Sequence, residues 1–173
     1  DRKESEFANK KAWNAWKRQA MEQSIPWFEK AFSGGMILAG RNYCHYYQYG
    51  RGDYIQPEPE KAVPIMRQGA EMGYPEWIYA YANHLAYTEE KHNEALPWAL
   101  KAAEAGHLWS WHIIGDIYWD GKAVERNLSY ALQCYEKTAG HGNDSYACRQ
   151  LGVMYFHGWG TDVDYARAVQ WLE

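Results

Sequence analysis

The sequence has few of the features that would assign it to several common protein classes. Its 173 residues include only three cysteines, Cys44, Cys134 and Cys148, and this odd count excludes a framework of paired disulfides. Their spacing lacks the close pair of a zinc site, so we interpret them as buried free thiols. No run of 18 apolar residues occurs, so no transmembrane segment is predicted. The net charge of −4 gives no long-range attraction for nucleic acid or an anionic membrane.

Signatures of catalysis are also missing. The chain has no glycine-rich phosphate loop with lysine, no His-Glu-x-x-His, no Gly-x-Ser-x-Gly and no Ser-x-x-Lys. His112 and Asp116 lie one helical turn apart and could share a metal, but a third ligand is missing, so we favour an exposed ion pair. We predict a protein that is not an enzyme and has no cofactor and no metal; a hydrolase-like or metal-binding enzyme is the least favoured alternative.

An internal repeat is the strongest positive signal. A small residue recurs at intervals of 38, 33 and 37 residues, and an aromatic or leucine follows it three positions later. An alanine then recurs in each unit, further along the chain. The small residues are Cys44, Ala82, Gly115 and Gly152, followed by Tyr47, Leu85, Tyr118 and Tyr155, and the alanines are Ala62, Ala95, Ala131 and Ala168.

Each repeat is predicted to form two antiparallel helices. In the segment His107–Gly121, apolar residues recur at helical spacing, and the small residue allows a neighbouring helix to come close. The second helix, Leu128–Gly142, carries an apolar stripe; Asn127 is placed to cap its start, as Asp164 is in the last repeat, and Gly142 to end it. The apolar stripe consists of Leu128, Ala131, Leu132, Tyr135 and Ala139.

Three prolines and the N-terminal segment predict further helix boundaries. Pro26, Pro64 and Pro97 occupy equivalent positions, and because proline is costly inside a helix, we expect the second helices to begin near these residues. Ser5–Gln23 is predicted to be a separate helix that covers the open end of the repeat array, or alternatively one that lies on a membrane surface.

The repeat pattern resembles the Sel-1-like repeat family, which is related to the tetratricopeptide repeats. The resemblance rests on Gly-x-x-Tyr in the first helix and on the glycine loops "DGKAVERN" and "HGWGTDVD" between the two helices. It implies an all-α fold, a right-handed α-solenoid of antiparallel helix pairs. We expect one domain over 1–173, with N-terminal helices in 1–35 and repeats at 36–73, 74–106, 107–142 and 143–173.

The stretch "YQYGRGDYIQPEPE" (Tyr47–Glu60) contains Arg51-Gly52-Asp53, a tripeptide that many extracellular ligands present to integrins. The repeat register instead interprets its glycines as turn residues between two helices. The distinctive feature is a loop two residues longer than its counterparts that carries Pro57 and Pro59. We expect this longer, stiffer loop to be a candidate partner contact.

The resemblance also implies where a partner would bind. In the related repeats, exposed positions of the first helices line a concave groove. These positions hold aromatic, arginine, histidine, asparagine and aspartate side chains, a composition typical of interfaces; the alternative is that some rings pack against the adjacent repeat. The predicted partner-binding residues are Arg41, His45, Tyr79, Asn83, Trp109, His112, Asp116, Trp119, Arg149 and Phe156.

The expected function is therefore a non-enzymatic module that binds another protein through its concave groove and loops. Two roles stay open. One is an immunity protein that neutralises a bacterial secreted effector or toxin, and the other is an adaptor or regulator in bacterial signalling or envelope processes. The chain begins at Asp1 and not at Met, so we expect the bacterial periplasm if a leader was removed before Asp1, and otherwise the cytoplasm.

Overall fold

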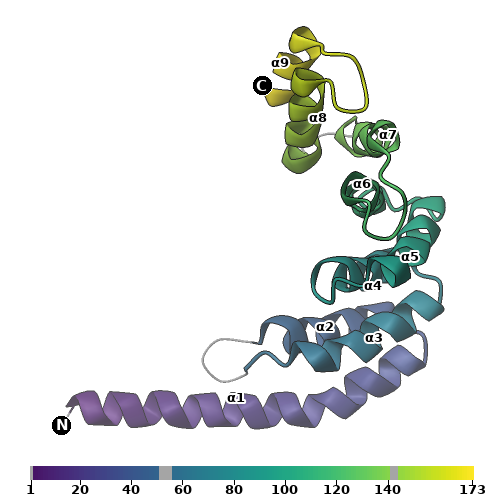
Figure 1. Cartoon of the computed structure of the whole chain (residues 1–173). Helices are drawn as coiled ribbons and strands as arrows, with labels where there is room; N and C mark the ends of the chain where they lie inside the picture. The colour runs from purple at the N-terminus through teal and green to yellow at the C-terminus, as the bar shows by residue number, and fades with distance from the viewer. Residues whose placement is uncertain (1, 51–55, 141–143) are drawn as a thin grey trace. The chain divides into compact units, whose positions relative to one another are not determined.

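The computed structural model describes residues 2–50, 56–140 and 144–173, and within these ranges it consists of helices without a strand (Figure 1). The predicted all-α fold class is confirmed. The helices of this described part are α1 (Arg2–Ser33), α2 (Ile37–Tyr49), α3 (Pro59–Glu71), α4 (Pro75–Tyr87), α5 (His92–Glu104), α6 (Ser110–Asp120), α7 (Leu128–Ala139), α8 (Ser145–His157) and α9 (Tyr165–Leu172).

Backbone contacts divide the chain into two compact units, Asp1–Gly69 and Ala70–Glu173. The first unit holds α1, α2 and most of α3. The second holds three consecutive helix pairs, α4 with α5, α6 with α7, and α8 with α9, and each pair also contacts the next one along the chain. The repeat unit predicted from the sequence is thus a helix pair, while the single-domain boundaries stay a prediction.

In the first unit, the long helix α1 packs against α2 through its C-terminal turn. Phe32 is almost fully buried, and its ring lies so close to Gly40 that a Cβ atom there would meet the ring carbons. Ser5–Gln23 is helical, as predicted, but the helix does not end there, because α1 continues without interruption to Ser33. Pro59 is the first residue of α3 and not a loop residue.

The expectation that these second helices start late, with the proline in or near the first turn, is also wrong. Pro26, Pro64 and Pro97 lie inside α1, α3 and α5. In α3 and α5 the proline is the sixth residue, so the backbone carbonyl that loses its donor belongs to Glu60 or Asn93 in the first turn. The three prolines and both of these first-turn residues are exposed, so water can satisfy the two carbonyls. The helix can therefore start earlier than the proline.

In the second unit, the small landmark residues let paired helices approach closely, as predicted. A Cβ atom on Gly115 of α6 would lie 2.8 Å from the Tyr135 ring of α7, and one on Gly152 of α8 would lie 2.5 Å from Cγ of Leu172 in α9. Ala82 of α4 is fully buried in the same way. Glycine or alanine is therefore needed for these helix contacts.

The loops between paired helices use the predicted caps. The side chains of Asn127 and Asp164 each accept a hydrogen bond, 3.0 Å long, from the backbone N–H three residues later. Gly121 and Gly158 end α6 and α8 with φ of 68° and 71°, a left-handed conformation that favours glycine. The tripeptide Arg51-Gly52-Asp53 and the predicted helix end at Gly142 lie outside the described residues.

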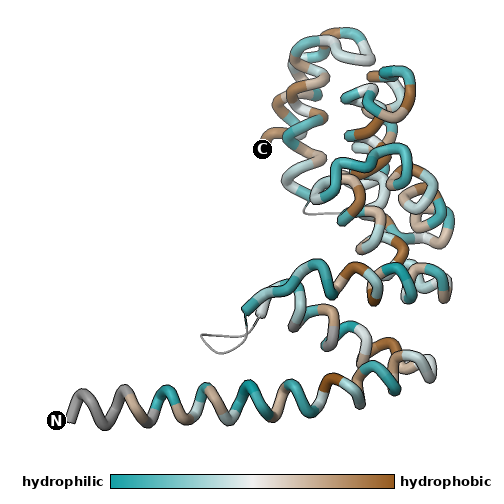
Figure 2. Tube along the Cα trace, turned by 60° about the horizontal axis from the view of Figure 1, so that its bottom comes forward, coloured by the Kyte–Doolittle hydropathy of each residue, from teal (hydrophilic) through white to brown (hydrophobic). Residues whose placement is uncertain are grey.

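Hydrophobic residues recur along the helices (Figure 2). Buried residues of α7, α8 and α9 form a core cluster in the second unit. Four of the five residues of the predicted α7 stripe are buried, and they pack with residues of α8 and α9; Leu128 is half-buried. Cys44 and Cys134 are buried free thiols, as predicted, and burial raises the pKa of each to about 12. Cys148 is also free but half-buried. Among the described helices, none has both the length and the hydropathy that a bilayer crossing requires.

Candidate partner-binding site

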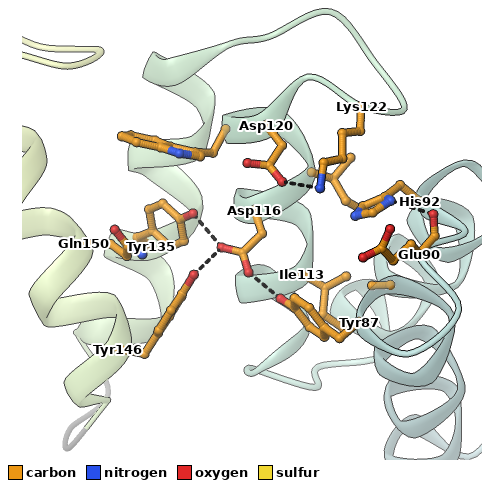
Figure 3. Close-up of a pocket in the computed structure, with 13 residues that line it drawn as sticks. Tyr87, Glu90, His92, Ile113, Asp116, Asp120, Lys122, Tyr135, Tyr146 and Gln150 are labelled. Carbon is orange, nitrogen blue, oxygen red and sulfur yellow. Dashed lines mark hydrogen bonds and ion pairs between the residues drawn. The ribbon is translucent and has the colours of Figure 1, made fainter.

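The second unit contains a pocket of about 270 Å³ that is lined by side chains of α4, α6, α7 and α8 and of the turn before α5 (Figure 3). Its lining combines four aromatic side chains with three carboxylates, and His92, Lys122 and Gln150 are its other polar residues. Two of the ten predicted partner-binding residues, Asp116 and Trp119, line it.

Asp116 lies at the centre of the pocket and accepts hydrogen bonds from three tyrosine hydroxyls (Figure 3). The Oη atoms of Tyr135 and Tyr146 lie 2.7 and 2.9 Å from its Oδ1. The hydroxyl of Tyr87 donates to Oδ2. One carboxylate therefore joins three different helices, α4, α7 and α8, to α6.

The repeat pattern explains how Tyr135 reaches this carboxylate. Its ring packs over Gly115, where a side chain would block it, and its hydroxyl then meets the next residue, Asp116. Tyr87 is the last residue of α4 and Tyr146 lies in the first turn of α8, so each approaches Asp116 from a neighbouring repeat. The small landmark residue thus permits both the helix packing and the hydrogen bond.

The three tyrosines hold their protons more tightly than free tyrosine does. Burial raises the pKa of Tyr87, Tyr135 and Tyr146, and the adjacent Asp116 charge raises it further; for Tyr146 the pKa is about 12. Half of the Tyr87 side chain is exposed, but its hydroxyl is the part that faces Asp116. At neutral pH the three hydroxyls are therefore donors.

Raising the pH above about 10 is expected to lower the free energy of unfolding. An unfolded Tyr146 loses its proton near its ordinary pKa of 10, whereas the folded one keeps it up to a pKa of about 12, so the contribution is complete below pH 10 and is lost above it. Urea denaturation at several pH values between about 9 and 11.5 would measure this fall. Tyr146→Phe should make the fall shallower, and an unchanged slope in this variant would contradict the assignment.

The rim of the pocket adds further charges. Asp120 pairs with Lys122, with 3.2 Å between Oδ2 and Nζ, and the side chains of both residues are exposed. Glu90 also lines the rim, and its backbone oxygen lies 2.8 Å from Nδ1 of His92 (Figure 3). Three carboxylates thus face one lysine ammonium around the pocket, which leaves its surroundings acidic.

His112 and Asp116 do not form the ion pair with each other that the sequence suggested. His112 Nε2 instead bonds to Oδ2 of Asp144, and Asp116 is occupied by tyrosine hydroxyls. Asp144 is buried and caps α8, because its Oδ1 accepts from the Ala147 N–H at 3.1 Å. The two α6 side chains therefore have different partners. Within the described residues, no three His, Cys, Asp or Glu side chains lie close enough to hold a metal ion.

The other predicted residues lie outside the pocket, and their contact with a partner stays a prediction. In the second unit, Tyr79 stacks on His107 with 4.2 Å between ring centres, while Trp119 lies 5.3 Å from the Trp159 ring, so part of this aromatic surface packs between repeats. Exposed residues are Arg41 and His45 on α2 in the first unit, Trp109 before α6, and Arg149 and Phe156 on α8; Asn83 on α4 is half-buried.

Several residues of the site are absent from the predicted set. Tyr87 and Tyr146 occupy first-helix positions, five after Ala82 and six before Gly152, where the repeat geometry already indicated the groove. Tyr135 was assigned to the core stripe, and it does lie there, with only its hydroxyl reaching the site. An acidic residue directly before a helix is a capping signal, and this signal could have identified Asp144.

Stacked antiparallel helix pairs and a side-chain pocket define this protein as a helical-repeat, protein-interaction module. The Sel1 repeat matches residues 37–74, 79–107, 112–143 and 145–173. The chain therefore belongs to the Sel1 repeat family, and the resemblance found in its sequence and the predicted solenoid class are confirmed. Sel1 repeats generally act as non-catalytic scaffolds that bind proteins.

Comparison with known proteins adds three relatives. A Sel1 repeat protein of Oxalobacter formigenes has a TM-score of 0.76 and 28% identity, over 87% of this chain and 60% of that one. The immunity protein Pa5087 of Pseudomonas aeruginosa has a TM-score of 0.55 and 19% identity, over 86% and 55%, and so shares the fold. DAP3-binding cell death enhancer 1 of Rattus norvegicus is 34% identical over 96 residues, which are 54% of this chain and 18% of that protein. The chain thus spans about a fifth of the length of that curated relative.

Proposed function

We propose that the chain binds one partner protein through the pocket and the aromatic surface beside it, as the immunity protein of a bacterial secreted effector. The observation that carries the proposal is a pocket whose aromatic walls surround a carboxylate. Such sites accept a protruding side chain of a partner, and buried aromatic and charged anchors supply most interface energy.

The surface beside the pocket supports the same proposal. Tyr146 lines the pocket, and the Arg149 guanidinium lies over its ring, 5.6 Å from the centroid. The His112 ring lies 5.4 Å from the Tyr146 ring and 5.6 Å from that of the exposed Trp109. Tryptophan, tyrosine and arginine are the residues most often found as interface anchors. The Pseudomonas aeruginosa immunity protein is a precedent for this role on this fold.

An adaptor or regulator is the second candidate. The rat relative is named for binding DAP3, and its similarity to this chain covers 18% of its own length, as expected for a binding segment within a larger protein. An adaptor that recognises many short segments would use the same pocket with weaker affinity. Affinity and the number of partners therefore separate the two roles.

Trp119→Ala and Arg149→Ala are each expected to weaken partner binding by more than about 2 kcal/mol, because both remove an anchor at or beside the pocket. The partner would be identified by affinity capture and its binding to the purified full chain measured by calorimetry. An immunity protein should bind one partner at nanomolar or tighter affinity, and micromolar binding to several would favour the adaptor.

Trp27→Ala is the matched control, since Trp27 is 72% exposed on α1 and belongs to the first unit. It should leave the affinity unchanged. Helix content, measured by circular dichroism, must be native in each variant, because Trp119 also packs against the core. Full affinity in both test variants would contradict the proposed surface.

A further inference from the structure

The charge balance of the pocket favours a cationic occupant. Among the described residues that line the pocket, Glu90, Asp116 and Asp120 contribute three carboxylates against Lys122 and His92. Lys122 is already paired with Asp120 at the exposed rim, and the His92 ring bonds to the Glu90 backbone oxygen. Tyr87, Trp119, Tyr135 and Tyr146 supply aromatic walls, whose faces attract cations and pack against methylene groups. An acidic pocket with aromatic walls is suited to a positively charged group on an aliphatic stem.

The hydrogen bonds of Asp116 restrict the shape of that cation. A carboxylate offers about four lone-pair directions on its two oxygens. Oδ1 receives both Tyr135 and Tyr146, whereas Oδ2 receives Tyr87 alone among the described residues. One acceptor direction therefore remains on Oδ2.

The tyrosine oxygens provide further acceptors near that direction. Each hydroxyl donates its proton to Asp116, so its oxygen can still accept a hydrogen bond. Tyr146 already receives one from the Gln150 side chain. Tyr87 and Tyr135 are the remaining two, and they reach Asp116 from different sides, Tyr135 at Oδ1 and Tyr87 at Oδ2 (Figure 3). The Tyr87 oxygen is therefore the acceptor that lies beside the free direction of Oδ2.

A carboxylate with one free acceptor direction matches an ammonium better than a guanidinium. The lysine ammonium directs three N–H donors from a single nitrogen. Arginine forms its strong pair with a carboxylate through two parallel N–H bonds, one to each oxygen. Oδ1 of Asp116 is filled, so this paired geometry cannot form.

We infer that the pocket centred on Asp116 receives the primary ammonium of a lysine side chain that the partner protein presents, an inference that rests on the proposed function. A lysine attached to a protein is favoured over a free amine because the pocket continues through Tyr146 into the surface of Trp109, His112 and Arg149. The rest of the partner would cover that surface.

The test uses the ¹⁵N-labelled full chain and needs no partner. The probe is the peptide acetyl-Gly-Lys-Gly-amide, with matched peptides that carry arginine, norleucine or Nε-acetyllysine in place of lysine. We expect the lysine peptide to shift the NMR signal of the Trp119 indole N–H. The other three should bind at least about tenfold more weakly. Norleucine and Nε-acetyllysine lack the positive charge, and arginine cannot form its paired hydrogen bonds because Oδ1 of Asp116 is filled.

Two variants locate the binding. Asp116→Asn removes the central charge at constant size and should weaken the lysine peptide about tenfold. Asp162→Asn is the control, because Asp162 is an exposed acid outside the pocket lining, and binding should not change. If Asp116→Asn fails to fold, the four peptides on the unaltered chain still decide the question.

Three results would overturn the inference. Equal binding of the arginine or norleucine peptide would show that the ammonium is not recognised, and silence of all four peptides at millimolar concentration would show that the pocket takes no such group. Butylammonium that binds as well as the lysine peptide would point to a free amine instead of a partner's side chain. If Trp119→Ala weakens the partner complex but none of the four peptides binds, the proposed function stands and this inference does not.

Discussion

Gly160→Ala is expected to lower the free energy of unfolding by about 2–5 kcal/mol. Gly160 has φ of 76°, a left-handed conformation that costs an alanine about 1–2 kcal/mol. A Cβ atom there would also lie 2.5 Å from the carbonyl oxygen of Leu128 and 2.7 Å from the Ser129 nitrogen. Backbone atoms cannot rotate aside, so the loop must move away from α7 and release the hydrogen bond from Ser129 Oγ to the Gly160 carbonyl.

Gly106→Ala is the matched control for this prediction. Gly106 has φ of 87°, but a Cβ atom there would meet nothing within 4 Å, so the conformational cost of about 1–2 kcal/mol stands alone. Urea denaturation followed by tryptophan fluorescence would give both losses. Equal losses in the two variants would show that the contact between the glycine loop and α7 contributes nothing to stability.

Asp116→Ala should reduce the free energy of unfolding by about 2–4 kcal/mol, because it removes the shared acceptor of three hydroxyls. The largest part comes from Tyr135, which is only 1% exposed and donates to Asp116 at 2.7 Å. Tyr146 is half-buried and adds less, and Tyr87 can turn toward solvent. The loss should be read from urea denaturation at neutral pH.

Asp120→Ala provides the comparison on the same helix face, one turn later. Its ion pair with Lys122 is exposed at both side chains, and such pairs contribute at most about 1 kcal/mol. A loss as large in Asp120→Ala as in Asp116→Ala would mean that acidic charge at this end of α6, and not the tyrosine hydrogen bonds, stabilises the unit.

Much of the fold was predictable because each repeat uses the same local rules. The small residue at Gly115 and Gly152, and the caps at Asn127 and Asp164, are decided by neighbours within one helix pair, so a single sequence reveals them. The helix starts near the prolines were mispredicted because a general rule was applied where local exposure decides. A general cost of proline in helices was applied to Pro64 and Pro97, whose lost hydrogen bonds fall on exposed first turns where water compensates.

The site was less predictable because it joins side chains from several repeats. The sequence identified Asp116 and Trp119 as groove residues from their place in the repeat. It could not show that Asp116 would meet three tyrosines and that His112 would bond to Asp144, since helical spacing fixes the face of a side chain but not the neighbour it meets. Tyr135 shows this best, because one residue serves the core with its ring and the site with its hydroxyl.

The carboxylate of Asp116 also has a consequence for how the second unit unfolds. Stability of a repeat protein is usually a sum of repeat terms and nearest-neighbour interface terms. Asp116 bonds to Tyr87 in the preceding helix pair and to Tyr146 in the following one, so it couples two pairs that are not adjacent. Fraying of α8 and α9 alone would break this coupling, and the three pairs should therefore open together, with similar hydrogen-exchange rates for the core amides of α4 and α8.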